Sequence, residues 1–184
     1  LGWVAVRVGA QRGEKVLMRH GTIGANQMVY QTLVGTGDHV VAVTPTYQQH
    51  TAMPRSLGAD VAEVALSEAQ NWLPDWDEVA AAVTPATKVI ALTNPNDPTG
   101  ALIGRDGLER VADIARGVDA WVLCDEVYRG TEQGEPVPSI VDVYDKGIST
   151  GSTSKAFSLA GLRLGWIVGP QGLLDDCEVH RDYT

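Results

Sequence analysis

The chain has 184 residues, of which 44% are hydrophobic, and its 14 basic and 23 acidic side chains give a formal net charge of −9 at pH 7. This length and composition suit one domain with a sizeable core, and they exclude disordered, collagen-like and disulfide-scaffold classes. The acidic balance, without a cluster of Lys or Arg, argues against a nucleic-acid-binding surface. No apolar stretch reaches the roughly 18–20 residues that a membrane helix needs, so we expect no membrane partner.

Residues 1–10 show neither the basic start nor the small-residue cleavage site of a signal peptide. The two cysteines, Cys124 and Cys177, lie far apart, and their spacing fits neither a disulfide framework nor a thiol metal site. These features lead us to expect a soluble cytoplasmic protein.

Short apolar, β-branched runs alternate with helical patterns, which is typical of a sheet built from βα units. In chain order, the predicted strands cover 16–19, 40–44, 61–65, 88–93, 120–125, 147–151 and 165–169. The predicted helices cover 24–35, 47–57, 75–83, 105–116 and 170–181. Strands such as 88–93 are apolar on both faces, as expected for strands covered by helices on both sides. The sequence therefore predicts a three-layer αβα fold around a mostly parallel, seven-stranded sheet.

Common nucleotide and metal motifs are missing. The chain has neither the Walker pattern nor the GxGxxG fingerprint, which weakens nucleotide-binding hypotheses. Its four histidines have no zinc-ligand spacing, and we expect them to be surface or loop residues; they are His20, His39, His50 and His180. We therefore expect no metal site.

One serine-hydrolase pattern does occur, because residues 147–151 (GISTG) fit GxSxG. A nucleophile elbow needs an apolar strand before the serine and a helix directly after it. Here Asp145 and Lys146 precede the pattern, and an extended stretch rich in Ser and Thr follows it. Only Asp175 and His180 could complete a triad in the proper order, and both fall on one predicted helix. The hydrolase hypothesis is thus disfavoured.

Four short segments with chemically capable side chains come in a fixed order. They are 94–100 (NPNDPTG), 125–128 (DEVY), 152–155 (STSK) and 161–165 (GLRLG). The first three follow predicted strands. Because ligands of open α/β sheets bind outside the carboxyl ends of the strands, we expect these three segments to share one rim of the sheet.

The side chains in these segments suit one kind of chemistry. A lysine such as Lys155 can form a Schiff base with a carbonyl cofactor. The carboxylate of Asp125 can pair with a pyridinium nitrogen, so that the ring accepts electrons. The guanidinium of Arg163 can bind a phosphate through two charge-assisted hydrogen bonds. Together these groups indicate a pyridoxal 5′-phosphate (PLP) site.

With these motifs the chain resembles the large domain of fold-type I PLP-dependent enzymes of the class I/II aminotransferase family. The matching motifs are NPNDPTG, DEVY, STSKAFSLAGLRLG and, upstream, HGTIGAN. The resemblance implies a PLP-binding large domain over 20–184, after an N-terminal segment and first-strand region over 1–19. It also implies that the small C-terminal domain of the family is absent from this chain.

The resemblance assigns roles around the cofactor ring. Lys155 holds PLP as a Schiff base and then moves a proton, Asp125 salt-bridges the pyridine nitrogen, and Tyr128 donates to the O3′ oxygen. Tyr47 falls where the family places the aromatic ring that stacks on the pyridine. The phosphate is bound by Ser152, Ser154 and Arg163, and by backbone amides of a helix N-terminus at Thr22, Ile23 and Gly24.

Asp97 is a departure from the family pattern. Family members usually have Asn just before Pro-Thr-Gly, where its amide donates to O3′. An ionised carboxylate beside that oxygen is repulsive, so we expect Asp97 either to keep its proton or to turn away. We retain Asp97 as a cofactor neighbour. The first residue of the motif, Asn94, does not stand at the ligand position.

The leading hypothesis is the PLP-binding domain of an aminotransferase-like enzyme that acts on an amino acid and a keto acid, as a homodimer by resemblance. Three alternatives remain open. One is a lyase or cyclase of the capreomycidine synthase-like branch. Another is a truncated domain that binds PLP without complete catalysis, because family members run to roughly twice this length. The last is a PLP-binding sensor that has lost a DNA-binding partner domain.

Overall fold

The structure is a computed structural model that describes residues 15–180, so residues 1–14, most of the predicted segment 1–19, lie outside the described residues, as do 181–184. The strands are β1 (Lys15–His20), β2 (His39–Thr44), β3 (Asp60–Ala65), β4 (Thr87–Thr93), β5 (Trp121–Asp125), β6 (Gly147–Ser152) and β7 (Leu164–Gly169). The α-helices are α2 (Gly21–Leu33), α3 (Gln49–Ser56), α4 (Trp76–Ala82), α5 (Arg105–Gly117) and α6 (Gln171–Val179). Short 3-10 helices lie between these elements; they are η1 (Glu68–Gln70), η2 (Ile140–Asp142) and η3 (Ala160–Leu162).

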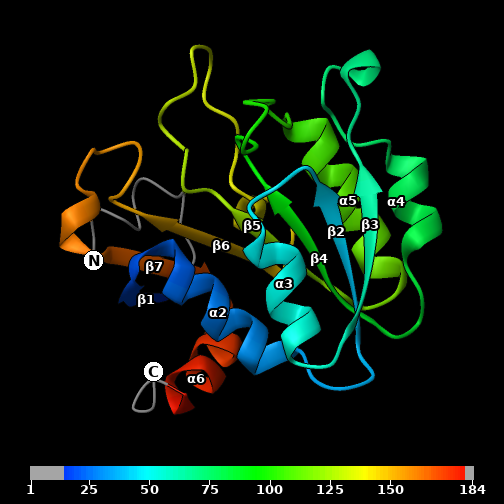
Figure 1. The fold of residues 1–184 in the computed structure, drawn as a ribbon, viewed down its shortest axis with the longest axis horizontal. Coiled ribbons are helices and arrows are strands. Elements are labelled where there is room, and N and C mark those ends of the chain that lie inside the picture. The colour runs from blue at the N-terminus through cyan, green and yellow to red at the C-terminus, as the bar shows by residue number, and fades with distance from the viewer. Residues whose placement is uncertain (1–14, 181–184) are drawn as a thin grey trace.

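The seven strands form one sheet in the order β1-β7-β6-β5-β4-β2-β3 (Figure 1). Strands β2 to β6 pair in parallel, whereas β7 runs antiparallel to both β6 and β1. The mostly parallel, seven-stranded sheet predicted from the sequence is therefore confirmed. Since β2, β4, β5 and β6 are parallel, their carboxyl ends meet at one edge of the sheet.

Helices cover both faces of the sheet and enclose two main cores, which confirms the three-layer arrangement. On one face α4 and α5 pack on side chains such as Ile90 and Val122. On the other face α2, α3 and α6 pack on Val89 and Leu123, the sequence neighbours of that first pair. Fully burying one such side chain contributes about 1.5–3 kcal/mol, which explains why the central strands are apolar on both faces.

The backbone of α2 and that of β7 approach one another very closely. Gly21 has φ +70°, and its N–H donates to the Arg163 carbonyl oxygen at 2.9 Å. A Cβ atom on Gly165 would lie 2.5 Å from the Gly21 carbonyl oxygen, well inside van der Waals contact. The two glycines therefore let the start of α2 lie directly against β7.

The prediction that all four histidines are surface or loop residues is wrong for two of them. His39 is buried at the start of β2, and its Nδ1 lies 2.8 Å from Thr87 Oγ1. His50 is buried in α3, with Nδ1 2.9 Å from the Tyr30 hydroxyl. Each imidazole has a polar partner inside the core, which offsets the cost of its burial.

The predicted obstacles to a serine hydrolase are confirmed. Ser149 is fully buried within β6, and the strand continues to Ser152 without turning into a helix. A nucleophile elbow needs an exposed serine at a strand-to-helix turn. Within residues 15–180, moreover, none of the helices is long and apolar enough to cross a bilayer.

Candidate active site

A cavity of about 380 Å³ lies at the sheet edge where the parallel strands end. Its walls come from the starts of α2 and α3 and from the segments after β4, β5 and β6. The lining residues are Thr22, Ile23, Tyr47, Thr93, Asp97, Asp125, Val127, Tyr128, Ser152, Ser154, Lys155, Ala160 and Arg163. Every predicted site residue is thus in the lining except Gly24, which is the next residue along α2.

Lys155 and Tyr128 face each other across this cavity. The Lys155 ammonium nitrogen lies 5.4 Å from the centre of the Tyr128 ring. Among the described residues, Lys155 forms no ion pair. Its amine is therefore held by a weak cation–π contact rather than by a carboxylate, and it is available to react.

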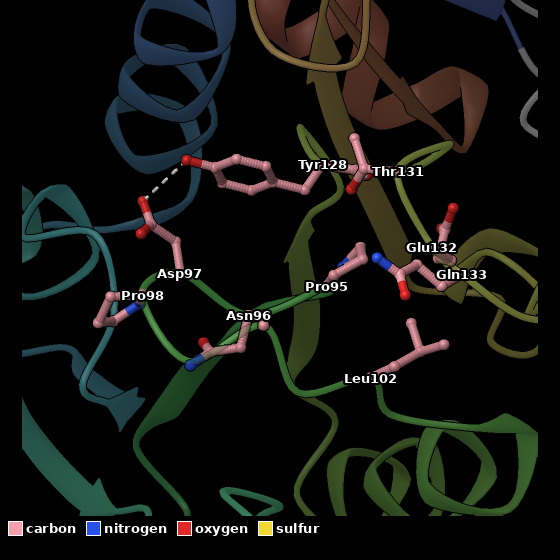
Figure 2. A pocket seen from close by; sticks show the side chains of 10 residues that line it. Pro95, Asn96, Asp97, Pro98, Leu102, Tyr128, Thr131, Glu132 and Gln133 are labelled. Carbon is pink, nitrogen blue, oxygen red and sulfur yellow. Dashed lines mark hydrogen bonds between the residues drawn. The ribbon is translucent and has the colours of Figure 1, made fainter.

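The Asp97 side chain points toward Tyr128. The Tyr128 hydroxyl donates to Asp97 Oδ2 at 3.3 Å, and Figure 2 shows the two side chains pointing toward one another. Asp97 and Tyr128 also line a second cavity of about 520 Å³. The other residues of that cavity are Pro95, Asn96, Pro98, Gly100, Leu102, Thr131, Glu132 and Gln133.

Hydrogen-bond donors gather at the end of the 380 Å³ cavity nearest β7. Arg163 adopts a left-handed backbone conformation, and its Nη1 donates to the Ala160 carbonyl at 3.0 Å and approaches Ser154 Oγ at 3.4 Å. The Ser154 N–H donates to Ser152 Oγ at 3.2 Å. Thr22 Oγ1 is buried and has no hydrogen-bond partner among residues 15–180. An arginine, hydroxyl groups and a helix N-terminus together make a set of donors suited to an anion.

Asp125 is the buried acid of the cavity. It ends β5, and its Oδ1 accepts a hydrogen bond from the Val127 N–H at 3.0 Å. Its Oδ2 accepts one from Asn26 Nδ2 at 2.8 Å, and His50 Nε2 lies 3.6 Å from the same oxygen. Burial, reinforced by the negative charge of Asp125, raises the pKa of the Tyr30 hydroxyl, which thus stays protonated beside His50.

The sequence analysis missed Asn26 and His50 as neighbours of Asp125. Both residues lie in helices, far along the chain from Asp125, and only the packing of α2 and α3 brings them to the end of β5. One usable signal existed for Asn26. It lies on the face of α2 that Ala25 and Val29 bury, where a polar side chain needs a partner.

Glu126 does not line the cavity and instead forms hydrogen bonds within the core. Its Oε1 accepts hydrogen bonds from Ser139 Oγ at 2.7 Å and the Ile140 N–H at 3.1 Å, which fixes η2 to the end of β5. Burial raises the pKa of Glu126, an effect that Arg129, 3.7 Å from Oε2, partly offsets. The folded protein therefore holds this proton more tightly than the unfolded chain does.

This difference predicts a pH-dependent effect of Glu126→Gln. Wild-type stability should fall as the pH rises from the ordinary Glu value of 4.5 toward the raised pKa, by about 1.4 kcal/mol for each unit of the shift. Glutamine still accepts both hydrogen bonds and does not ionise. The stability of the variant relative to the wild type should therefore increase as the pH rises over this range. Urea unfolding of both proteins at a series of pH values measures the difference, and parallel curves would contradict the prediction.

The described residues give no sign of a metal centre. Within 15–180 there is no group of three or more His, Cys, Asp or Glu side chains that could hold a metal ion. The 380 Å³ cavity brings together one amine, one buried carboxylate, two phenols and a set of anion donors.

Comparison with known proteins assigns the chain to a family. The aminotransferase class I and II family matches residues 5–180. The chain belongs to this family. The resemblance noted from NPNDPTG, DEVY and STSK is thereby confirmed.

Relatives of known name cover nearly all of this chain. Arginine–pyruvate transaminase of Pseudomonas aeruginosa is 34% identical over 87% of this chain and 42% of its own length. Capreomycidine synthase of Streptomyces vinaceus is 30% identical over 98% of this chain and 46% of its own length. The chain thus spans about half the length of the relatives it matches.

Solved structures agree with this assignment. A PLP-dependent aminotransferase from Streptococcus suis matches with a TM-score of 0.91 and 42% identity, over 98% of this chain and 49% of that one. Aspartate aminotransferase from Thermus thermophilus with maleate has the same TM-score at 26% identity and the same coverage. These neighbours identify the fold as the fold-type I PLP-transferase large domain, and the family uses pyridoxal phosphate.

The residues present fit this cofactor. Thr22 Oγ1 is a buried hydroxyl without a partner among the described residues, and it borders the anion donors around Arg163. The same cavity contains an amine at Lys155, which forms no ion pair within residues 15–180, for an aldehyde, and a buried carboxylate at Asp125 for a ring nitrogen. A phosphate, an aldehyde and a pyridine ring each find a complementary group.

Proposed function

We propose that residues 20–184 form the PLP-binding domain of an aminotransferase that acts on an amino acid and a keto acid. The observation that carries this proposal is the single cavity into which Lys155, Asp125 and Arg163 all project. When bound, pyridoxal phosphate supplies an aldehyde for Schiff-base formation and a ring that takes up electrons. The remaining steps belong to the side chains around it.

In this proposal Lys155 is the base. Its amine would anchor the cofactor through the aldehyde. Once released from that bond, the Lys155 amine would be the base that takes the proton from the substrate Cα and gives it back. The nearby Tyr128 ring keeps the lysine side chain over the cavity in the meantime.

The other residues bind and orient the cofactor. Asp125 would pair with the ring nitrogen. The Tyr128 hydroxyl donates to Asp97 in this structure and would turn its single proton to O3′ when the cofactor binds. Tyr47, exposed at the cavity mouth, stacks on the ring. The phosphate is bound by Thr22, Ile23, Gly24, Ser152, Ser154 and Arg163. The adjoining 520 Å³ cavity, which shares Asp97 and Tyr128, admits the substrate.

Borohydride trapping tests this proposal. After incubation with PLP and reduction, peptide mass mapping should find the pyridoxyl group on Lys155, and a visible absorption band should disappear on reduction. Protein reduced without PLP is the control. A label spread evenly over Lys15, Lys88 and Lys146, with no absorption band, would contradict the proposed role of Lys155.

A lyase or cyclase reaction is the second candidate. It is supported by the match to capreomycidine synthase, which covers 98% of this chain. The same cofactor and the same lysine serve both reactions, so the site does not distinguish them. Product analysis with an amino-acid donor and a keto-acid acceptor does, because only transamination gives an amino acid from the acceptor.

A homodimer is part of the proposal. Exposed apolar side chains surround the anion end of the cavity at Ile23, Leu159, Leu162 and Leu164. Apolar groups gathered on a surface favour contact with another protein surface. A second copy that packs here would cover the cavity rim, and the molar mass in solution measures its presence.

We also propose a cytoplasmic location. Both cysteines, Cys124 and Cys177, are free and buried in the core. Free thiols are the usual state in a reducing compartment. Fractionation of cells that produce the full-length protein checks this assignment.

A further inference from the structure

A line of side chains behind the cavity ends at the carboxylate of Asp125. Thr150 Oγ1 donates to Asn26 Oδ1 at 2.7 Å, and Asn26 Nδ2 donates to Asp125 Oδ2 at 2.8 Å. Asn26 Nδ2 also approaches Gln49 Oε1 at 3.3 Å, and Gln49 Nε2 donates to the Ile23 carbonyl at 2.8 Å. Asn26 and Thr150 are fully buried, so water does not substitute for these partners.

The orientation of every amide in this line is dictated by its neighbours. The Ile23 carbonyl only accepts, so the nitrogen of Gln49 faces it and the oxygen of Gln49 faces Asn26. Asn26 must therefore present its nitrogen to Gln49 and to Asp125, and its oxygen to the Thr150 hydroxyl. A reversed Asn26 amide would set its oxygen against both the Gln49 oxygen and the Asp125 carboxylate.

The fixed amide has a consequence for Asp125. The Asp125 carboxyl group receives N–H donors from Asn26 and Val127, so each of its two oxygens accepts a hydrogen bond from a fixed direction. His50, at 3.6 Å, is too far for a hydrogen bond to the same oxygen. Asn26 is thus the side chain that fixes the Asp125 oxygen Oδ2.

We propose that Asn26 is a positioning residue that, with Thr150, holds the Asp125 carboxyl group aimed at the ring nitrogen of the cofactor. The inference rests on the proposed function and deepens it. Asn26 does not line the cavity, so it affects the ring nitrogen through Asp125 rather than by direct contact. Its effect should therefore appear only with a ligand that has a ring nitrogen.

The test compares two ligands in the full-length protein, pyridoxal phosphate and its 1-deaza analogue, which has carbon in place of the ring nitrogen. The unmodified protein should bind PLP more tightly than the analogue. Asn26→Leu, of similar size, should lower this preference about tenfold, because it removes a hydrogen bond to a charged group. Its affinity for the deaza analogue should change by less than about threefold.

A second pair of variants keeps the inference testable if Asn26→Leu fails to fold. Thr150→Val removes the donor to Asn26 Oδ1 and should lower the preference for PLP in the same direction, whereas Thr150→Ser should restore it. Asn94→Leu is the matched control. Asn94 is a buried asparagine whose side chain, among the described residues, bonds only the Ile103 backbone, at 2.8 and 3.1 Å. Its loss should reduce stability and leave the preference unchanged.

The outcomes separate the two proposals. If Asn26→Leu weakens the binding of both ligands equally, Asn26 is only structural and the inference is overturned. The same holds if Thr150→Val keeps the wild-type preference for PLP over the deaza analogue. If the unmodified protein binds neither ligand, the proposed function itself fails. A loss of preference in both variants, with none in the control, supports the role of Asn26.

Discussion

Replacing Lys155 by alanine should lower the aminotransferase activity of the full-length protein by a factor of roughly 10²–10⁴, the range for losing one acid–base group. The variant should also lose the borohydride-stable pyridoxyl label. Lys155 has no ion pair among residues 15–180, so its removal should leave the fold intact. Steady-state kinetics, the label and circular dichroism of the same preparation measure these three effects.

Lys146→Ala is the matched control for this experiment. Lys146 comes just before β6, whereas Lys155 follows that strand. The Lys146 ammonium pairs with Asp119 outside the cavity. This variant should keep both activity and label, with at most about 1 kcal/mol lost from a partly exposed ion pair. If Lys155→Ala retains activity while Lys146→Ala loses it, the assignment of the base is wrong.

Gly165→Ala should destabilise the protein by about 3 kcal/mol, the upper part of the range for inserting one carbon into a closely packed position. The added Cβ would lie 2.5 Å from the Gly21 carbonyl oxygen, and backbone cannot rotate aside as a side chain can. Because the start of α2 and Arg163 meet at this contact, PLP binding should weaken as well. Urea unfolding and PLP titration measure the two losses.

Gly172→Ala tests whether this cost comes from the clash rather than from alanine itself. Gly172 lies in α6, and a Cβ there would meet nothing within 4 Å. Alanine in a helix is favoured over glycine by roughly 0.5–1 kcal/mol, so this variant should equal or exceed the wild type in stability. Equal destabilisation of both variants would rule out the close approach as the cause.

The strands could be predicted from the sequence because burial on both faces leaves a strong local signal. The predicted strand 88–93 appears as Thr87–Thr93, and 120–125 appears as Trp121–Asp125. The position of three motifs at one edge of the sheet could also be predicted from the sequence, because parallel strands end at a common edge. Asp125 and Ser152 terminate neighbouring strands there, as expected.

The contacts behind the site could not be predicted in this way. Asn26 meets Asp125 only because α2 packs across β6 and β7, and no local pattern encodes that pairing. His50 was expected to be a surface or loop residue, although it is buried against Tyr30. The side-chain direction of Asp97 likewise depends on the position of Tyr128, which lies on a different segment.

The pairing of β1 with β7 joins distant parts of the chain, so we expect this pair of strands to form late in folding. Lys15 and Gly169, near opposite ends of the described chain, are partners in this ladder. Such non-local pairs close large loops and form slowly. The βα units of the central parallel strands, whose contacts are more local, form before them. The cofactor cavity needs Thr22 from beside β1 and Arg163 from beside β7. During synthesis the cavity is therefore complete only once β7 has emerged, and a ligand bound there stabilises the state in which β1 and β7 are paired.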